Sequence, residues 1–229
     1  MQPYWFPYIG YFQLMSAVDT FIVYDNVQYT KKGWVNRNRI LHQSQPVQIS
    51  IPIKKGGHSL FIIDRIIADN WSTQRWRILN QVRDFYLQAP MYQDVFPLVE
   101  NCLLHEDLNL FRHISYSIRK TREYMGLAST FLVSSELKID HTLKGEDKVI
   151  AICSEIGAKQ YINPIGGTEL YSREKFASYG IDLRFLKSKQ IEYKQFDKSF
   201  VPWLSIIDVL MFNDLETTNQ FLKHEYMLL

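Results

Sequence analysis

The sequence predicts an α/β protein, built as a Rossmann-like parallel sheet with an inserted set of helices. Short apolar, β-rich runs alternate with helical stretches at both ends of the chain. In the last third, a helix, a glycine and a strand follow one another twice, which implies parallel pairing. The middle of the chain has helical periodicity only. We therefore expect an α/β core from 1–70 and 126–229, with a helical insertion or subdomain at 71–125.

The composition is that of an ordinary globular protein and excludes several classes. Of 229 residues, 46% are hydrophobic and 22% are charged, so the chain is neither disordered nor of low complexity. No apolar run reaches about 18 residues, and no basic stretch followed by an apolar one opens the chain, so we expect neither a transmembrane segment nor a signal peptide. Cys102 and Cys153 lie in apolar helical patterns, which indicates reduced, buried thiols in a cytoplasmic protein.

The first elements form half of a βαβ unit. Prolines keep the aromatic opening out of a helix before Pro7. Apolar spacing predicts a short helix over 9–18, and the run Thr20–Tyr24 between two aspartates predicts a buried strand. The first strand of this unit is missing. It lies elsewhere in the chain or upstream of Met1, and we favour the upstream position.

A hairpin is expected next. Its arms are 35–41 and 47–53, joined by polar residues at 42–46, and 61–67 reads as one more strand. The remaining helices are expected at 71–88, 92–104, 108–125, 146–156, 169–179, 201–212 and 215–227. The remaining strands are expected at 131–133, 160–163 and 181–186.

The net charge of +2 hides an asymmetry along the chain. Residues 1–90 hold ten lysines and arginines against five acidic residues, whereas 91–229 hold sixteen against nineteen. No acidic residue lies between Asp25 and Asp64, and a field of this sign favours an anionic ligand. The window contains these six cations: Lys31, Lys32, Arg37, Arg39, Lys54 and Lys55. They are too few for a nucleic-acid face, so the phosphate or carboxylate of a small molecule fits better.

The densest polar cluster follows the first predicted strand. Asp25 ends that strand, and Gln28 and Tyr29 come directly after it. Ligands of open parallel sheets bind at the carboxyl ends of strands. Asp25 is therefore the candidate general base of the site.

The run from Asn36 to Arg39 alternates amides and cations. An arginine grips phosphate or carboxylate through two parallel hydrogen bonds, and asparagine amides suit sugar hydroxyls. In an extended strand Asn36 and Asn38 share one face, while Arg37 and Arg39 share the other. A polar edge strand with solvated arginines explains the same spacing.

Other signals are weaker. Gly10 precedes a short helix, and Gly166 and Gly167 precede another helix start, so each could bring a phosphate to a helix N-terminus. A tight turn and an ordinary helix cap explain them as well. Aromatic residues at 4–11 and 24–39, interleaved with cations, could stack a base or sugar ring. The histidines lack metal-ligand spacing, so we expect no zinc site, and neither a serine-nucleophile motif nor a phosphate loop occurs.

A second polar cluster stands near the C-terminus. Lys194 and Gln195 precede a predicted helix in which Ser205 and Asp208 are three residues apart. Asp208 is embedded among apolar residues, and a buried aspartate must be paired or protonated. Its partner could be an arginine of the basic window. Helix capping or a structural ion pair are the alternatives.

Taken together, these segments resemble the WbqC-like protein family of bacteria over nearly the whole chain. The resemblance rests on Gln2-Pro3, Pro7, Gly10-Tyr11-Phe12, Asp19, Asp25, Val27-Gln28-Tyr29, Trp34, Asn36 to Ile40, Tyr86, Ala89-Pro90, Gly157-Ala158, Tyr161, Gly166-Gly167, Tyr171, Phe176, Gly180-Ile181, Phe200, Pro202, Ser205-Ile206 and Asp208. Members of that family commonly belong to gene clusters for O-antigen or other surface polysaccharides. The resemblance therefore implies a role in surface-polysaccharide biosynthesis more firmly than it implies any particular reaction.

The opening is also similar to that of nucleotidylyltransferase-like enzymes, which hold ATP phosphates with a His-x-Gly-His turn. Here Tyr8 and Tyr11 stand where those histidines would be. A tyrosine hydroxyl can hydrogen-bond a phosphate but supplies no cation near neutral pH. This departure weighs against adenylyl transfer, although ATP stays a candidate co-substrate.

Our leading hypothesis is acyl or aminoacyl transfer onto an amino sugar or nucleotide-sugar of a surface glycan. The alternatives are a non-catalytic nucleotide-sugar-binding or assembly protein, and a glycosyltransferase-type enzyme. The candidate catalytic residues are Asp25 and Asp208. The candidate substrate-binding residues are Tyr8, Gly10, Tyr11, Gln28, Tyr29, Asn36, Arg37, Asn38, Arg39, Lys194 and Gln195.

Overall fold

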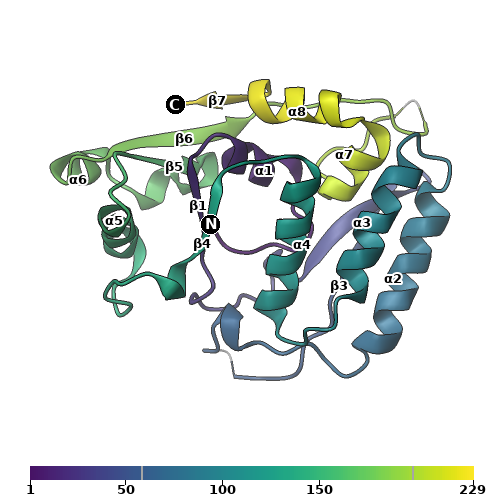
Figure 1. Ribbon diagram of the computed structural model, residues 1–229, viewed down its shortest axis with the longest axis horizontal. Coiled ribbons are helices and arrows are strands. Elements are labelled where there is room, and N and C mark those ends of the chain that lie inside the picture. The colour runs from purple at the N-terminus through teal and green to yellow at the C-terminus, as the bar shows by residue number, and fades with distance from the viewer. Residues whose placement is uncertain (58, 198) are drawn as a thin grey trace.

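A computed structural model describes residues 1–57, 59–197 and 199–229, and it shows a mixed α/β protein (Figure 1). Its helices are α1 (Ile9–Ser16), α2 (Trp71–Tyr86), α3 (Tyr92–Leu104), α4 (Leu110–Tyr124), α5 (Gly145–Glu155), α6 (Arg173–Ser178), α7 (Ile206–Phe212) and α8 (Leu215–His224). Its strands are β1 (Thr20–Val23), β2 (Arg37–His42), β3 (Gln45–Ser50), β4 (Thr130–Val133), β5 (Gln160–Pro164), β6 (Asp182–Ser188) and β7 (Tyr226–Leu228). The 3-10 turns are η1 (Ile62–Asp64), η2 (Ser134–Glu136) and η3 (Ile165–Leu170).

The described strands pair in three small sheets. β1 and β4 form a parallel pair, β2 and β3 form an antiparallel hairpin, and β5 pairs in parallel with β6, which in turn pairs antiparallel with β7. The α/β class is therefore confirmed, and so is the parallel pairing of the strands expected at 160–163 and 181–186. A single Rossmann-like sheet is not formed by these pairings.

The hairpin is tighter than the sequence indicated. Only Gln43 and Ser44 separate its strands, both with positive φ, at 47° and 58°. Two left-handed residues form the type of turn whose twist matches that of the flanking strands. The prediction of a strand at 61–67 is wrong. Residues Ile62–Asp64 form η1 instead, because the main chain here folds back onto the segment after β1 through bonds such as Ile62 N–H to Val27 O, at 2.9 Å.

The middle of the chain is helical, as expected. α2, α3 and α4 stand side by side on the right of Figure 1. They bury apolar stripes that include Ile78 and Val82 of α2, Val99 of α3 and Ile118 of α4. Asn109 caps α4 by accepting the Arg112 N–H through its side chain. The division into an α/β core and a helical insertion stays a prediction.

Two helices of the C-terminal half begin later than expected. The helix predicted over 169–179 begins only at Arg173, because η3 occupies the glycine pair Gly166 and Gly167, so those glycines do not start an α-helix. The helix predicted over 201–212 begins at Ile206, where Ser205 caps it with its hydroxyl oxygen. The helix predicted over 215–227 ends at His224, and the chain then turns into β7.

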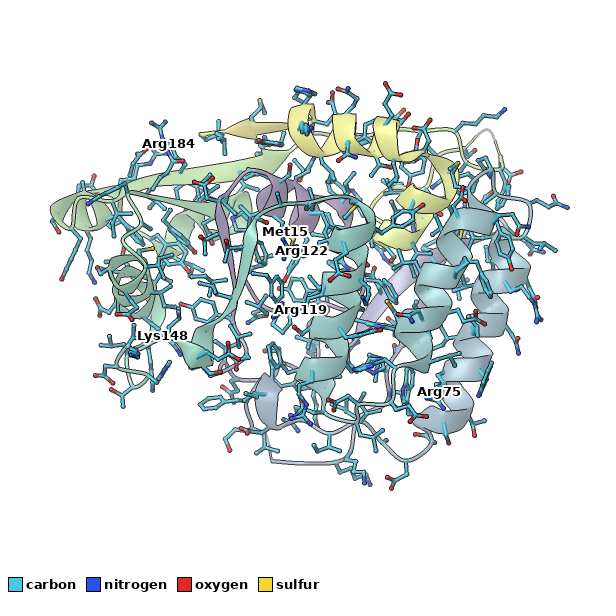
Figure 2. All side chains as sticks on the ribbon, in the orientation of Figure 1. Met15, Arg75, Arg119, Arg122, Lys148 and Arg184 are labelled. Atoms are coloured by element: carbon cyan, nitrogen blue, oxygen red, sulfur yellow. The ribbon has the colours of Figure 1, made fainter. Side chains whose placement is uncertain are left out.

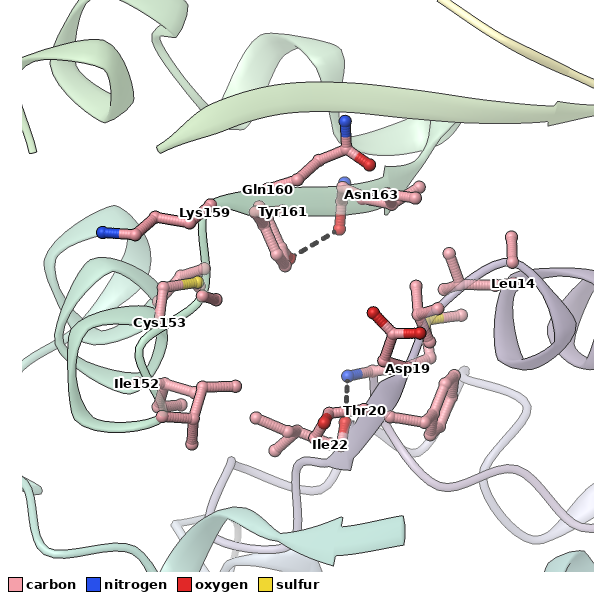
Figure 3. Close-up of a pocket in the computed structure, with 18 of the residues that line it drawn as sticks. Leu14, Asp19, Thr20, Ile22, Ile152, Cys153, Lys159, Gln160, Tyr161 and Asn163 are labelled. Carbon is pink, nitrogen blue, oxygen red and sulfur yellow. Dashed lines mark hydrogen bonds between the residues drawn. The ribbon is translucent and has the colours of Figure 1, made fainter. Parts of the chain in front are cut away.

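An open space separates β1 from β5. The Met1 amine donates to Ile22 O at 2.7 Å, and Tyr24 N–H donates to Met1 O at 2.8 Å, which is the bonding pattern of a parallel strand beside β1. Burial lowers the pKa of this amine to about 5. Next to Met1, a cavity of about 500 Å³ lies between β1 and β5, and Figure 3 shows Ile22 and Tyr161 facing each other across it. The strand expected ahead of β1 is not found among the described residues.

Within the described part of the chain, no helix is both long and apolar enough to cross a bilayer. Cys102 and Cys153 are free and buried, as expected. Burial raises the pKa of the Cys102 thiol to about 12 and that of the Cys153 thiol to about 11.

Candidate functional site

A cavity of about 950 Å³ opens at the carboxyl end of β1. Its walls are the segment after β1, the loop that leads into α5, and β5. Its polar and aromatic lining comprises Gln2, Tyr4, Tyr24, Asn26, Gln28, Phe61, His141, Thr142, Lys144, Lys148, Tyr161, Asn163 and Tyr171. The size suits a small molecule, and the end of parallel strands is where α/β proteins bind ligands.

Lys148 is the buried cation of this cavity (labelled in Figure 2). It lies on α5 with 6% of its surface exposed, and its ammonium donates to Asn26 Oδ1 at 2.9 Å. The ammonium is also 5.6 Å from the centre of the Tyr24 ring. Burial lowers the pKa of Lys148, while the negative charge of Asp25 opposes that shift. A partly desolvated ammonium in a cavity wall is suited to holding an anionic group.

Asn26 links three parts of the site. Its side-chain oxygen accepts from Lys148 and from the Ser134 hydroxyl, and its Nδ2 donates to His141 Nδ1 at 3.0 Å. His141 Nε2 lies 3.1 Å from the carbonyl of Leu137. An amide nitrogen only donates and a carbonyl only accepts, so these contacts fit a neutral His141 that carries its proton on Nε2.

Asp25, the candidate general base, lies behind the cavity wall rather than in it. Its carboxylate has no exposed surface and accepts from the Ser134 hydroxyl at 2.8 Å, from the Ser135 N–H at 3.0 Å and from the Ser135 hydroxyl at 2.5 Å. These bonds fasten η2, which follows β4, to the end of β1. We therefore expect Asp25 to position Asn26 and the serine turn, and not to touch a ligand.

A second, smaller recess adjoins the first cavity and shares Met1 and Tyr4 with it. Its volume is about 410 Å³. Three of the expected binding residues, Tyr8, Asn38 and Arg39, line it together with Trp34 and Trp203. The Arg39 Nη2 donates to Trp203 O at 3.1 Å, and the guanidinium carbon lies 5.2 Å from the centre of the Trp34 ring.

The alternation predicted for the run 36–39 is observed. Asn36 and Asn38 are both buried, with 7% exposed, whereas Arg37 and Arg39 are less buried. The amides bind main chain: Asn36 Nδ2 donates to Ile51 O at 2.7 Å, and Asn38 Nδ2 donates to Phe6 O at 2.6 Å. Arg37 donates to the carbonyl of Lys31. Of these four residues, Asn38 and Arg39 line the recess, whereas Asn36 and Arg37 do not.

Three other expected binding residues lie inside the protein. Tyr11 has no exposed surface and packs against Phe21 with ring centroids 5.1 Å apart. Gly10 lies within α1 rather than before it, and its Cα approaches Tyr8 so closely that a Cβ would fall 2.3 Å from the Tyr8 ring. The Tyr29 hydroxyl donates to Asn36 Oδ1 at 2.8 Å. We expect these three to shape the site without contacting a ligand, while Gln28 lies in the larger cavity.

Asp208 has no arginine partner, so that expectation is wrong. Its carboxylate has no exposed surface and accepts from Tyr86 at 2.7 Å, from Tyr193 at 2.6 Å and from Gln195 Nε2 at 2.8 Å. Burial raises the pKa of Asp208, although the three donors oppose that shift. Gln195 is thus buried as a partner of Asp208, while Lys194 is exposed. The partners of Asp208 are therefore neutral donors. Arg37 and Arg39 donate to the main-chain carbonyls of Lys31 and Trp203 instead.

Sequence reasoning missed Lys148 and the two tryptophans as site residues. Lys144 is the residue before α5 and Lys148 lies in its first turn, so both lie where the helix begins. Trp34 and Trp203 each adjoin a polar motif already singled out, the run 36–39 and Ser205 respectively. A tryptophan close to such a motif was the available signal.

The fold and these cavities define an α/β protein with a basic and aromatic cavity at its strand ends. The sequence model of the WbqC-like protein family matches residues 2–220, and the chain belongs to this family. The chain is also 28% identical over 219 residues to Uncharacterized protein Rv1507c of Mycobacterium tuberculosis, a match that covers 92% of this chain and 90% of that protein. No solved structure matches it.

Proposed function

We propose that this WbqC-like protein acts in the biosynthesis of bacterial surface polysaccharide such as O-antigen, by acyl or aminoacyl transfer onto the amino sugar of a nucleotide-sugar. The observation that supports this proposal is the buried ammonium of Lys148 in the wall of a ligand-sized cavity at the end of β1. A phosphate is the anionic group that a nucleotide-sugar and an activated acyl donor have in common. Lys148 and Lys144 are placed to hold it.

The described walls of this cavity contain no acidic side chain, so nothing in them repels a diphosphate. The lining adds the amides of Asn26, Gln28 and Asn163 and the hydroxyls of Tyr24 and Tyr161, which suit ribose or sugar hydroxyls. In the transfer step, the sugar amine attacks the activated acyl carbon. A C–N bond forms, the C–O bond to a phosphate or the C–S bond to a thioester carrier breaks, and the amine loses a proton to water. The site contributes by holding the phosphate and orienting the amine.

A non-catalytic nucleotide-sugar-binding role is the second candidate, and one observation favours it. Asp25 and Asp208, the two carboxylates expected to act as acid or base, have no exposed surface and accept hydrogen bonds from neutral donors. Neither carboxylate reaches the cavity lining. A protein that binds without turnover needs no such group.

Calorimetry with UDP-glucosamine tests the site. We expect Lys148→Met to weaken binding about 10- to 100-fold, because a hydrogen bond to a charged group is lost in a partly desolvated place. Lys223→Met, which removes an exposed lysine of α8, is the matched control and leaves binding unchanged. Equal affinity of wild type and Lys148→Met rules out this placement of the phosphate.

Mass spectrometry of the same sugar, incubated with ATP and amino acids or with acyl-coenzyme A, tests the reaction. A mass gain on the sugar amine that depends on the protein supports acyl transfer, and release of AMP or ADP identifies the activation step. Binding with no product in any mixture supports the non-catalytic role.

A further inference from the structure

We propose that the smaller recess, lined by Tyr8, Trp34, Arg39 and Trp203, binds the ring of an acidic pyranose. In the proposed reaction this sugar carries a carboxylate as well as the amine. This inference rests on the proposed function and deepens it by naming the class of sugar. Its own evidence is separate from that for the phosphate site at Lys148.

The recess has walls of aromatic ring. Trp34 is 45% exposed and Trp203 is 57% exposed, although both are large apolar side chains. The Tyr8 ring meets the Trp203 ring edge-on, with centroids 6.2 Å apart. Exposed apolar surface around a hollow marks a binding site. A pyranose fits such walls because it has an apolar C–H face and a polar rim, and a volume of about 410 Å³ is sufficient for one.

The charge of the recess selects an anion. Arg39 is its only cationic lining residue among those described, and the described lining includes no acidic side chain. Only one guanidinium hydrogen bond to the described protein is found, from Nη2 to Trp203 O, and the buried Nε makes none. An arginine has donors only, so the missing partner must be an acceptor, and a carboxylate makes the strongest such bond.

Backbone strain is concentrated at this recess. Four described residues other than glycine have positive φ, and the turn of the hairpin accounts for Gln43 and Ser44. The other two are Phe6, at 43°, and Trp203, at 60°. The Phe6 carbonyl is held by Asn38 Nδ2 and by the Ser205 hydroxyl at 2.8 Å. Strain of this kind persists only where the surroundings enforce it, and it is concentrated at ligand sites.

The two cavities are placed for one elongated ligand. They share Met1 and Tyr4 in their linings. A sugar ring between the tryptophans therefore has its linked phosphates on the side of Lys148, which is the order of groups in a nucleotide-sugar.

Free monosaccharides test the recess without involving the phosphate site. Sodium glucuronate and glucose are titrated while tryptophan fluorescence and saturation-transfer NMR are recorded. We expect glucuronate to bind wild type at least 10-fold more tightly than glucose. Arg39→Gln abolishes that preference, and Trp203→Gly or Trp34→Ala weakens glucuronate binding at least 10-fold. Trp76→Ala is the matched control, since Trp76 is 49% exposed on α2 and lines neither cavity.

Trp203→Gly also separates binding from folding. Glycine relaxes a φ of 60°, so the melting temperature of this variant stays at or above that of wild type while sugar binding is lost. The proposal is overturned if wild type binds glucuronate no better than glucose, or if both tryptophan variants bind it as wild type does. If Lys148→Met loses UDP-glucosamine binding but glucuronate does not bind the recess, the proposed function is supported and the recess proposal is not. If glucuronate binds through the tryptophans but no nucleotide-sugar binds, the recess proposal is supported and the proposed function is not.

Discussion

Replacing Asp208 by alanine destabilises the fold rather than the site. The carboxylate joins three elements, because Tyr86 comes from α2, Tyr193 and Gln195 come from the segment after β6, and Asp208 itself lies on α7. Tyr86 extends the network by accepting the Leu41 N–H of β2 at 2.8 Å. Asp208→Ala leaves three donors without their shared acceptor.

The size of the effect follows from the burial of those donors. Tyr86 has no exposed surface and Gln195 has 3%, so water does not replace the lost carboxylate easily. A buried donor that loses its partner costs about 1–3 kcal/mol. We therefore expect a loss of about 3–5 kcal/mol in the free energy of unfolding, which for a chain of this length lowers the melting temperature by about 10 °C.

Urea denaturation followed by circular dichroism measures this loss. Asp69→Ala is the control, since its ion pair with Lys54 is at the surface, with the Asp69 side chain 85% exposed, and such a pair contributes less than about 1 kcal/mol. Burial raises the folded pKa of Asp208 above the unfolded value, so its contribution to stability is greatest at low pH and declines as pH rises through the folded pKa. A loss below 1 kcal/mol for Asp208→Ala at neutral pH would refute the reasoning.

Three further predictions concern buried groups and the hairpin. Burial lowers the pKa of His113 from 6.5 to about 4. Between these pH values, His113 is neutral in the folded protein and takes up a proton when the protein unfolds. The free energy of unfolding of wild type, measured with urea, should therefore fall by about 3 kcal/mol relative to that of His113→Phe between pH 7 and pH 4, and the same pH dependence in both proteins would contradict this. Replacing Gln43 and Ser44 by Asn and Gly relaxes two left-handed residues and should add about 1 kcal/mol of stability, whereas a lower melting temperature would exclude that turn. Cys102 should react with a thiol reagent only after denaturation, because burial raises its thiol pKa to about 12, and fast labelling of the native protein would count against the packing described.

The periodic parts of this fold could be predicted from the sequence, and the reason is local. Helix α4 carries apolar residues close to a helical period, and two helix–glycine–strand runs implied the parallel pair β5 and β6. The start of α6 at Arg173 could not be predicted from the apolar spacing. Residues 165–170 carry a glycine pair and a polar pattern that fit a helix start, but Pro164 and the tight packing of Gly167 against Asn163 favour a 3-10 turn.

The site could be predicted only in outline. The basic window, Tyr8 and Arg39 pointed to an anionic ligand, and the two latter residues do line a recess. Which polar residue faces a cavity depends on tertiary packing. Asn36 is bound by the main chain of Ile51, and Asp25 is bound by serines that follow β4. Those contacts are not encoded in local spacing. Lys148 is distant from the window in sequence and joins Asn26 only through the fold.

Asn26 connects the cavity wall at Lys148 to two other segments of the protein. One amide side chain touches the serine turn, helix α5 and the imidazole of His141. An anion that draws the Lys148 ammonium toward itself relieves Asn26 of one donor, and the remaining bonds must readjust together. Segments separated from Asn26 by more than a hundred residues would therefore report occupancy together, as a joint change in amide exchange near residue 134 and at the start of α5.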